Sequence, residues 1–507
     1  MKSGLGLTAF IMAGILSIFL LLLNWSDIAR AGELPYLLAS LGGLVCVAVA
    51  VRSSRYWLSS FSAYSGFFYL FHCGLLIILA FDLPFEPLNP NDSSWIWSLE
   101  TAYAAIMYLM GHIAFTVAGC VVVLLRRERG QAAGGVDPRD LDTAGRFGLV
   151  LFLFGLTVWI YQTWTSGAAV FGGSYTEFLE ATGGGIMPYA YFAISFGLAL
   201  AGLAHSTVIV RAALLVFVLW ALPAFALGLR GEVIIPALLF GVVRARMGRL
   251  PFRKRYLMGL VAMLAAGSLV RETRSSGLSA SGVTDSNLNP LSGVAELGYT
   301  IRPLSLVYQW HAMRAEPYVG PGTYLSPFTR LISGRTFDGH SVSLESDPTV
   351  FNYVITERVG PIGGSPVAEA FRAGGMPAVL LVMASIGFLC VLMDRRFSSV
   401  LALSAATMFT YVLLVWVRNN VNPIAVSLLL IAMVSVALWA VLVLSRSSSS
   451  RGSSGGGTAS EVTLSTWAGP PEQGASSRGL DQRGYPPGLP PALNTAGSQK
   501  PSWYNHA

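Results

Sequence analysis

Long apolar stretches alternate with short polar loops over the first 445 residues of the chain. A hydrocarbon core about 30 Å thick requires about 20 consecutive apolar residues for one helical crossing. The pattern therefore predicts an all-α fold, a polytopic transmembrane helical bundle of about 12 spans. The expected spans are residues 4–23, 35–51, 63–80, 101–125, 147–164, 187–204, 208–227, 231–243, 256–270, 375–393, 398–417 and 421–444. The eighth is short and contains Pro236, which favours a tilted, broken or re-entrant helix there.

Basic residues gather in alternate loops and predict the orientation of these spans. Lysine and arginine favour the cytoplasmic side of a membrane. The loops on one side carry "RSSR" (52–55), "RRERG" (126–130), "RARMGRLPFRKR" (244–255) and "DRR" (394–396), and Lys2 lies on the same side. We therefore expect a multi-pass membrane protein with both termini in the cytoplasm. The net charge of +7 reflects this bias and does not indicate nucleic-acid binding.

Composition agrees with a membrane protein. Only 12% of the residues are charged and 53% are hydrophobic, whereas soluble proteins carry about 25% charged residues. Lys2 before an apolar run and "ARA" at 29–31 leave a signal peptide as an alternative for the first span, but the long run favours a retained helix. The four cysteines all fall within expected spans, which favours apolar packing over disulfides or metal binding.

Three parts are expected along the chain. Residues 1–445 form the transmembrane body, and an extracytoplasmic loop, 271–374, is inserted between spans nine and ten. Within this loop, 288–313 has the pattern of amphipathic helices lying on the outer surface, and 318–334 reads as a compact, turn-rich piece. Residues 446–507 are rich in Ser, Gly and Pro, which predicts a disordered cytoplasmic tail.

Ionisable groups are scarce inside the expected spans. His72 and His112 lie well within them, and a histidine hydrogen-bonded to a neighbouring helix is the favoured interpretation. Asp140 and Asp142 have a spacing that can hold a metal ion, but helix-start chemistry explains them better. We expect no metal and no cofactor, because no other cluster has metal-ligand spacing and neither a phosphate loop nor "GxSxG" occurs.

Arginines collect where the outer ends of the spans are expected. They are Arg230, Arg271, Arg274, Arg302 and Arg418. Guanidinium groups bind phosphate oxygens in bidentate fashion, so this set is typical of a site for a lipid-linked diphosphate. The alternative is that each arginine reaches lipid headgroups or pairs locally, as Arg230 would with Glu232.

Acids and bases accompany the arginines on the same side. They are Glu232, Glu272, Glu296, His311 and Glu369. A general base must lie beside the hydroxyl that it deprotonates. A solvated or helix-capping carboxylate is the alternative for Glu296 and for Glu369.

Five segments carry a family resemblance. In order they are "GLRGEVIIP" (228–236), "RETRSSGLS" (271–279), "LNPLSGVAELGYTIRPL" (288–304), "GPGTYLSP" (320–327) and "GGSPVAEAFRAGGMPAVLL" (363–381). The pattern resembles the O-antigen polysaccharide polymerase (Wzy) family over about 228–420, whereas the first seven spans match only in hydropathy. Where the family often has Asn-Phe, this chain has Arg372 and Ala373.

The resemblance implies a GT-C-like glycosyltransferase of the bacterial cytoplasmic (inner) membrane that polymerises undecaprenyl-diphosphate-linked oligosaccharide repeats by inverting, metal-independent transfer. It implies Arg230, Arg271, Arg274 and Arg418 as diphosphate ligands, with Arg302 and His311 also binding substrate. Glu232, Glu296 or Glu369 would be the base, and Tyr299 and Trp310 would be sugar platforms. The implied partners are the lipid bilayer, the lipid-linked glycan, and chain-length regulator and flippase proteins.

Three other functions stay open at this point. A ligase would move the same lipid-linked glycan to another acceptor. A flippase or exporter would suit the number of spans, although the lack of ionisable groups at mid-span disfavours it. A non-catalytic scaffold of a glycan assembly complex is supported only by the tail.

Overall fold

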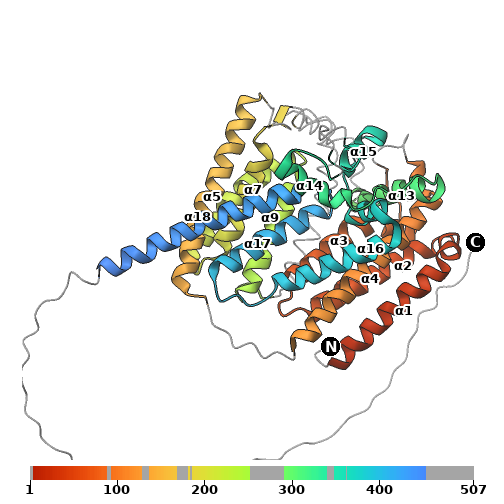
Figure 1. Cartoon of the computed structure of the whole chain (residues 1–507), viewed down its shortest axis with the longest axis horizontal. Coiled ribbons are helices and arrows are strands. Elements are labelled where there is room, and N and C mark those ends of the chain that lie inside the picture. The colour runs from red at the N-terminus through yellow and green to blue at the C-terminus, as the bar shows by residue number, and fades with distance from the viewer. Residues whose placement is uncertain are drawn as a thin grey trace, which may run out of the picture. The chain divides into compact units, whose positions relative to one another are not determined.

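Helices are the regular elements of the part of the chain that the structure describes (Figure 1). The structure is a computed structural model, and it describes residues 4–87, 93–127, 136–167, 178, 181–182, 185–251, 290–337, 339, 347–360 and 362–452. The ninth expected span (256–270), together with Arg271, Glu272 and Arg274, lies outside these residues, as does 453–507.

Eleven helices correspond to expected spans. They are α1 (Gly4–Ala29), α2 (Leu34–Ser53), α3 (Ser60–Ala80), α4 (Leu99–Arg127), α5 (Pro138–Thr165), α7 (Met187–Leu203), α8 (Thr207–Ala226), α9 (Arg230–Arg246), α16 (Pro366–Met393), α17 (Val400–Trp416) and α18 (Pro423–Gly452). Within the described ranges, 8 helices are long and apolar enough to cross a membrane. The helices α7, α9 and α17 have 17 residues each, which at about 1.5 Å per residue falls short of a full hydrocarbon core.

Several boundaries differ from the expected ones. Helix α9 runs without a break through Pro236, where a broken or re-entrant helix was an option. Helix α16 begins at Pro366 rather than at 375 and is kinked at Gly374 and Gly375, since both glycines have non-helical backbone angles. Helix α18 continues to Gly452, past the expected end of the body at 445.

The loop between spans nine and ten contributes buried structure. Residues 290–313 form a nearly continuous helical run made of α12 (Pro290–Leu297), η3 (Gly298–Ile301), α13 (Arg302–Tyr308) and η4 (Gln309–Met313). This run packs against α3 and α4 and buries Ile301, Leu304 and Val307. The expectation that it lies on the outer surface is therefore wrong. Its apolar side faces other helices, because Gly74 and Gly298 let two backbones approach within contact distance.

Two further loop helices follow this run, α14 (Gly322–Ser333) and α15 (Phe351–Val359). Residues 318–334 were expected to be turn-rich, but α14 occupies most of that segment. Pro327 is the sixth residue of α14, and the helix runs through it to Ser333.

Two apolar cores hold the bundle together. The larger joins α2, α3, α4, α16 and α17, and the smaller lies among α5, α7, α8 and α9. Figure 1 shows α1–α4 with α16 on one side of the bundle and α5, α7 and α9 on the other. At one end, Arg246 donates to the Met393 carbonyl (2.6 Å) and to Asp394 (3.0 Å), while Asp394 accepts the Ser60 N–H (2.8 Å). These bonds tie α9, α16 and α3 together.

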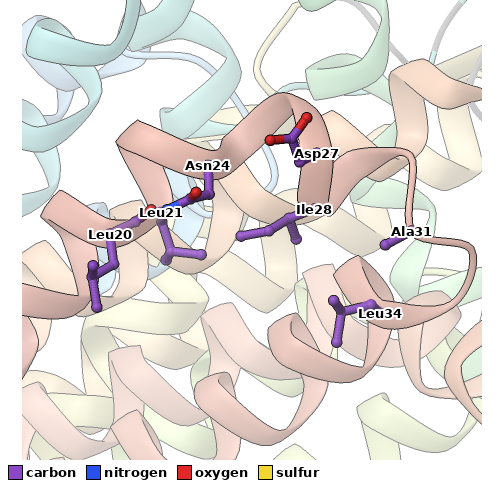
Figure 2. A pocket seen from close by; sticks show the side chains of 7 residues that line it. All are labelled: Leu20, Leu21, Asn24, Asp27, Ile28, Ala31 and Leu34. Atoms are coloured by element: carbon purple, nitrogen blue, oxygen red, sulfur yellow. Dashed lines mark hydrogen bonds between the residues drawn. The ribbon is translucent and has the colours of Figure 1, made fainter.

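A hollow of about 470 Å³ lies at the junction of α1 and α2. It is lined by Leu20, Leu21, Asn24, Asp27, Ile28, Ala31 and Leu34 (Figure 2). In Figure 2 the carboxylate of Asp27 points away from the leucine and isoleucine side chains, and the Asn24 amide is bonded to the Leu20 carbonyl of its own helix. With no polar groups converging on it, this hollow lacks the features of a catalytic site.

Glycines allow helices α5 and α7 to cross with their backbones in contact. A Cβ on Gly197 of α7 would come within 2.3 Å of the Phe152 backbone nitrogen of α5, and one on Gly148 within 2.5 Å of the Ala201 nitrogen. Backbone atoms cannot move aside as a flexible side chain does, so even a methyl group forces the two helices apart.

We therefore expect Gly197→Ala to destabilise the protein by about 1–3 kcal/mol or more, as overpacking does. Thermal unfolding of the detergent-solubilised protein, followed by size-exclusion fluorescence, measures the effect. Gly66→Ala on α3 is the matched control, because a Cβ there meets nothing within 4 Å. Equal unfolding temperatures for the two variants would contradict the proposed crossing.

Candidate functional site

One cavity brings together four of the residues expected at the site. Its volume is about 580 Å³, within the range of about 300–1,000 Å³ typical of ligand sites. Arg230, Glu232, Glu296 and Arg418 supply its charged groups. Its walls also include Phe67, Phe71, Tyr191, Phe192, Ile235, Ile362, Tyr411 and Val415.

Arg230 starts helix α9 and is paired across the fold. Its guanidinium donates to Glu296 of α12 at 2.9 Å, and the two side chains are only 5% and 9% exposed. The sequence suggested Glu232 as a local partner, whereas the structure shows a carboxylate 66 positions away. Gly228, at φ +89°, makes the turn that directs α9 into this position. The ion pair therefore joins the loop helix α12 to the bundle at the edge of the cavity.

Glu232 is the carboxylate of the cavity with an open side. It lies in the first turn of α9 and is partly exposed. Within the described part of the chain, no hydrogen bond or ion pair engages its side chain, in contrast to Glu296. A carboxylate of this kind can take a proton from a bound hydroxyl without first breaking an ion pair.

Arg418 lies in the turn between α17 and α18. Its side chain is exposed to the cavity, and its guanidinium lies 5.8 Å from the centre of the Phe71 ring. The Gly364 N–H donates to the Arg418 carbonyl at 3.0 Å. A Cβ on Gly363, at φ +80°, would lie 3.1 Å from that same carbonyl. The "GG" before α16 thus allows close contact with the turn that carries Arg418.

Glu369 holds this turn from inside the protein. Its side chain is 1% exposed. It accepts the Trp416 indole N–H at 2.9 Å and the Val421 N–H at 3.0 Å. Glu369 does not line the cavity, so its position suits organising the 416–421 turn better than touching a substrate.

A buried histidine supports the start of α16. The His72 Nδ1 atom donates to the Phe68 carbonyl at 3.0 Å, because a carbonyl can only accept. Its Nε2 atom therefore accepts the Ser365 hydroxyl at 2.9 Å, and Ser365 caps α16. Both ring nitrogens of His112 are hydrogen-bonded to hydroxyl groups, Nε2 to Ser65 at 2.8 Å and Nδ1 to Tyr108 at 2.7 Å. The interpretation of both histidines as hydrogen-bonded packing residues is confirmed.

Three helices begin at the cavity. Pro188, Arg230 and Pro423 line it and lie in the first turns of α7, α9 and α18. The start of a helix carries unpaired N–H groups and a partial positive charge, which favour bound anions. The four charged side chains of the cavity, two arginines and two glutamates, balance formally, so the helix ends add a partial positive charge beside Arg418.

The remaining expected substrate ligands lie elsewhere. Arg302 stacks over the Trp95 ring at 5.3 Å, and Tyr299 packs edge-on against the same ring at 5.5 Å. Trp310 is 3% exposed and its face is covered by Arg358 at 4.6 Å, so it offers no open face to a sugar. Of the expected set, Arg271 and Arg274 lie outside the described residues.

His311 is also removed from the cavity. It is buried, and its Nδ1 atom donates to the Glu316 carbonyl at 2.9 Å. Burial lowers the pKa of His311, while the bond to that carbonyl opposes this shift. Burial thus favours the neutral ring.

The sequence analysis missed the aromatic walls of the cavity. Phe67, Phe71, Phe192 and Tyr411 lie within expected spans and carry no local signal that separates a cavity wall from a lipid-facing side chain. Asp140, a doubtful metal ligand, pairs with Arg446, and Asp142 accepts the Ser206 N–H at 2.8 Å. No metal-binding group of acidic, His or Cys residues occurs among the described residues.

Comparison with known proteins gives one match. No curated protein and no solved structure matches the chain. The sequence profile of O-antigen polysaccharide polymerase Wzy matches residues 7–447, nearly all of the membrane body and its inserted loop. The chain therefore belongs to the O-antigen polysaccharide polymerase Wzy family.

Proposed function

We propose that this polymerase joins undecaprenyl-diphosphate-linked oligosaccharide repeats on the outer face of the cytoplasmic membrane, and that the cavity described above is its active site. One observation supports this assignment most directly. The cavity combines Arg418, the Arg230–Glu296 pair, a free Glu232 and the starts of three helices. Such a set suits a substrate that carries a diphosphate and a hydroxyl that must lose its proton.

The reaction we infer is an inverting transfer without a metal. The terminal hydroxyl oxygen of one repeat attacks the anomeric carbon of the growing chain, from the side opposite the lipid diphosphate. The new glycosidic C–O bond forms as the bond to the diphosphate breaks, and the bonding electron pair leaves with the diphosphate oxygen. The hydroxyl proton passes to Glu232. Cations fixed near the leaving oxygen stabilise its developing charge without reorganising.

The structure favours Glu232 over the two other carboxylates as the base. Glu296 is paired with Arg230 at 2.9 Å, so taking up a proton would weaken a buried ion pair. Glu369 is buried and bonded to Trp416 and Val421, away from the cavity. Glu232 alone among the three faces the cavity with no described partner.

A ligase that transfers the same glycan is a close alternative, because it needs the same leaving group. Length analysis of surface glycan separates the possibilities. Deletion of the gene leaves single-repeat glycan if the protein is a polymerase and none at the surface if it is an exporter. Loss of the finished polymer from its final acceptor, with full-length chains still made, would indicate a ligase.

Replacement of Arg418 tests the anion site. We expect Arg418→Ala to lower the polymerisation rate about 10²–10³-fold, as loss of one preorganised donor to a developing oxyanion does. Arg418→Lys retains the charge but not the bidentate geometry, so an intermediate rate is expected. The measurement is the ladder of products from purified protein and lipid-linked repeats.

The matched control is Arg314→Ala, which removes an exposed arginine of the loop that does not line the cavity. Arg230→Ala is a less clean test, since it leaves Glu296 as an unpaired buried charge and destabilises the fold by about 3–5 kcal/mol. Wild-type product ladders from Arg418→Ala at equal expression would exclude the proposed anion site.

Replacement of Glu232 tests the base. Glu232→Gln keeps the size of the side chain but cannot accept the proton, so we expect the rate to fall about 10²–10⁴-fold. Binding of the lipid-linked donor should be retained, and both quantities can be measured on the same preparation. Glu357→Gln, an exposed glutamate of α15, is the control. A Glu232→Gln enzyme with an unchanged rate would mean that another group takes the proton.

Glu369 is expected to act through Arg418. One oxygen of Glu369, Oε2, accepts both the Trp416 indole N–H and the Val421 N–H, and Oε1 accepts the Val421 N–H at 3.2 Å. In Glu369→Gln one of these oxygens becomes an NH₂ group, which faces at least the Val421 N–H as a second donor. The turn that carries Arg418 should then shift and activity should fall. A double-mutant cycle measures the coupling: in an Arg418→Ala background, Glu369→Gln should have little further effect. Fully additive losses would show that Glu369 acts independently of Arg418.

A further inference from the structure

Helix α14 buries small residues and exposes large apolar ones. Its buried positions are Gly322, Thr323, Ser326 and Pro327. The opposite side shows Leu325 (40% exposed), Phe328 (38%), Leu331 (45%) and Ile332 (86%). Positions 325, 328 and 332 follow a helical repeat and form one face. A helix at a water-facing surface has the reverse arrangement, with its large apolar side chains turned inward.

This arrangement is held in place by specific bonds. Gly334, at φ +68°, ends the helix, and its N–H donates to the Arg330 carbonyl at 2.9 Å. The Phe337 N–H donates to the Ser326 hydroxyl at 3.2 Å, from the buried side of the helix. Arg330 forms an ion pair with the buried Asp347. The apolar face is therefore presented by an anchored helix.

Helix α14 lies beside a helix that has the features of a membrane span. It packs against α16 and α18, and Figure 1 shows it beside the end of α18 that lies opposite the tail. Helix α18 is long and apolar enough to cross a membrane, and it exposes Leu429 (48%) and Met433 (59%) in that half. Two helices that pack together thus both expose large apolar side chains, and exposed apolar surface of this kind marks an interaction site.

We propose that the face of α14 formed by Leu325, Phe328, Leu331 and Ile332 is inserted into the lipid bilayer, at the boundary between headgroups and acyl chains. An interfacial helix of this kind buries its apolar face about 5–10 Å below the headgroups. Arg335, exposed just after the helix, is placed to contact lipid phosphates. The occupant is lipid rather than protein, because α14 packs against α16 and α18, two helices with the length and composition of membrane spans.

The insertion has a consequence for the cavity. Residues 362 and 363, just before α16, and Pro423, at the start of α18, all line it. Since α14 packs on both helices, its insertion fixes the cavity at the depth of the lipid headgroups. A lipid-linked diphosphate has its charged group at this depth. This consequence rests on the proposed function, whereas the insertion itself does not.

Site-directed spin labelling of the full chain in lipid nanodiscs tests the insertion. Ile332→Cys accepts a nitroxide selectively, because Cys46, Cys73, Cys120 and Cys390 are all buried. Collision with oxygen, which concentrates in lipid, is compared with collision with a water-soluble nickel chelate. We expect oxygen to dominate at residue 332. At Glu357→Cys, an exposed polar position on α15, the nickel chelate should dominate.

Leu325→Cys provides a second position on the same face and should report the same environment as residue 332. Access of the nickel chelate to both positions would show that the face is in water and would overturn the proposal. Protection from both reagents would show that a second copy or another protein covers the face, which also overturns it. An inactive Arg418→Ala background should give the same accessibilities, so failure of the proposed active site is distinguished from failure of the insertion.

Discussion

The energetic cost of placing a charge in hydrocarbon determines where this protein can hold its charged side chains. Charged side chains in a membrane core are costly unless they are paired or face water. In this structure the cavity that holds charged side chains lies where helices α7, α9 and α18 begin. Arg230, Glu232 and Arg418 thereby lie at helix ends and turns. Inside the bundle, His72 and His112 are hydrogen-bonded to neighbouring side chains, and the buried Glu369 is bonded to Trp416 and Val421.

The polar contacts around the cavity serve two different purposes. Arg418 and Glu232 face the open space, where a substrate can reach them. Glu369 and Ser365 are buried and hold the backbone segments that carry the cavity residues. Their bonds are made in a region of low dielectric, where an unpaired donor or acceptor is costly, so they specify one arrangement of the turn. The position of the turn that carries Arg418 thus depends on a buried carboxylate that does not line the cavity.

The inserted loop completes the cavity as well as covering it. Helix α12 brings Glu296 to Arg230, and the glycine contact between positions 74 and 298 seats the loop on α3. An arginine at this site would otherwise have to find its counter-charge on the same helix turn. Because Glu296 belongs to another segment, removal or displacement of the loop would leave the buried Arg230 without a counter-charge. The loop and the bundle therefore depend on each other for stability.

Hydropathy is a local property of the chain. It was sufficient to predict the helical class and the order of the helices, with boundaries mostly close to those observed. The sequence also included Arg230, Glu232, Glu296 and Arg418 in a larger set of candidate residues on the outer side, and only the structure brought these four together in one cavity. The sequence did not distinguish Glu232 from Glu369, since both follow glycine- or proline-containing turns near the start of a helix. Tertiary structure separated them, because Trp416 and Val421 close around Glu369 while Glu232 keeps an open side.

The apolar pattern of 290–313 likewise indicated an amphipathic surface without showing what covers it. Which surface a helix meets depends on contacts between residues far apart in sequence, and those are set by packing rather than by local composition.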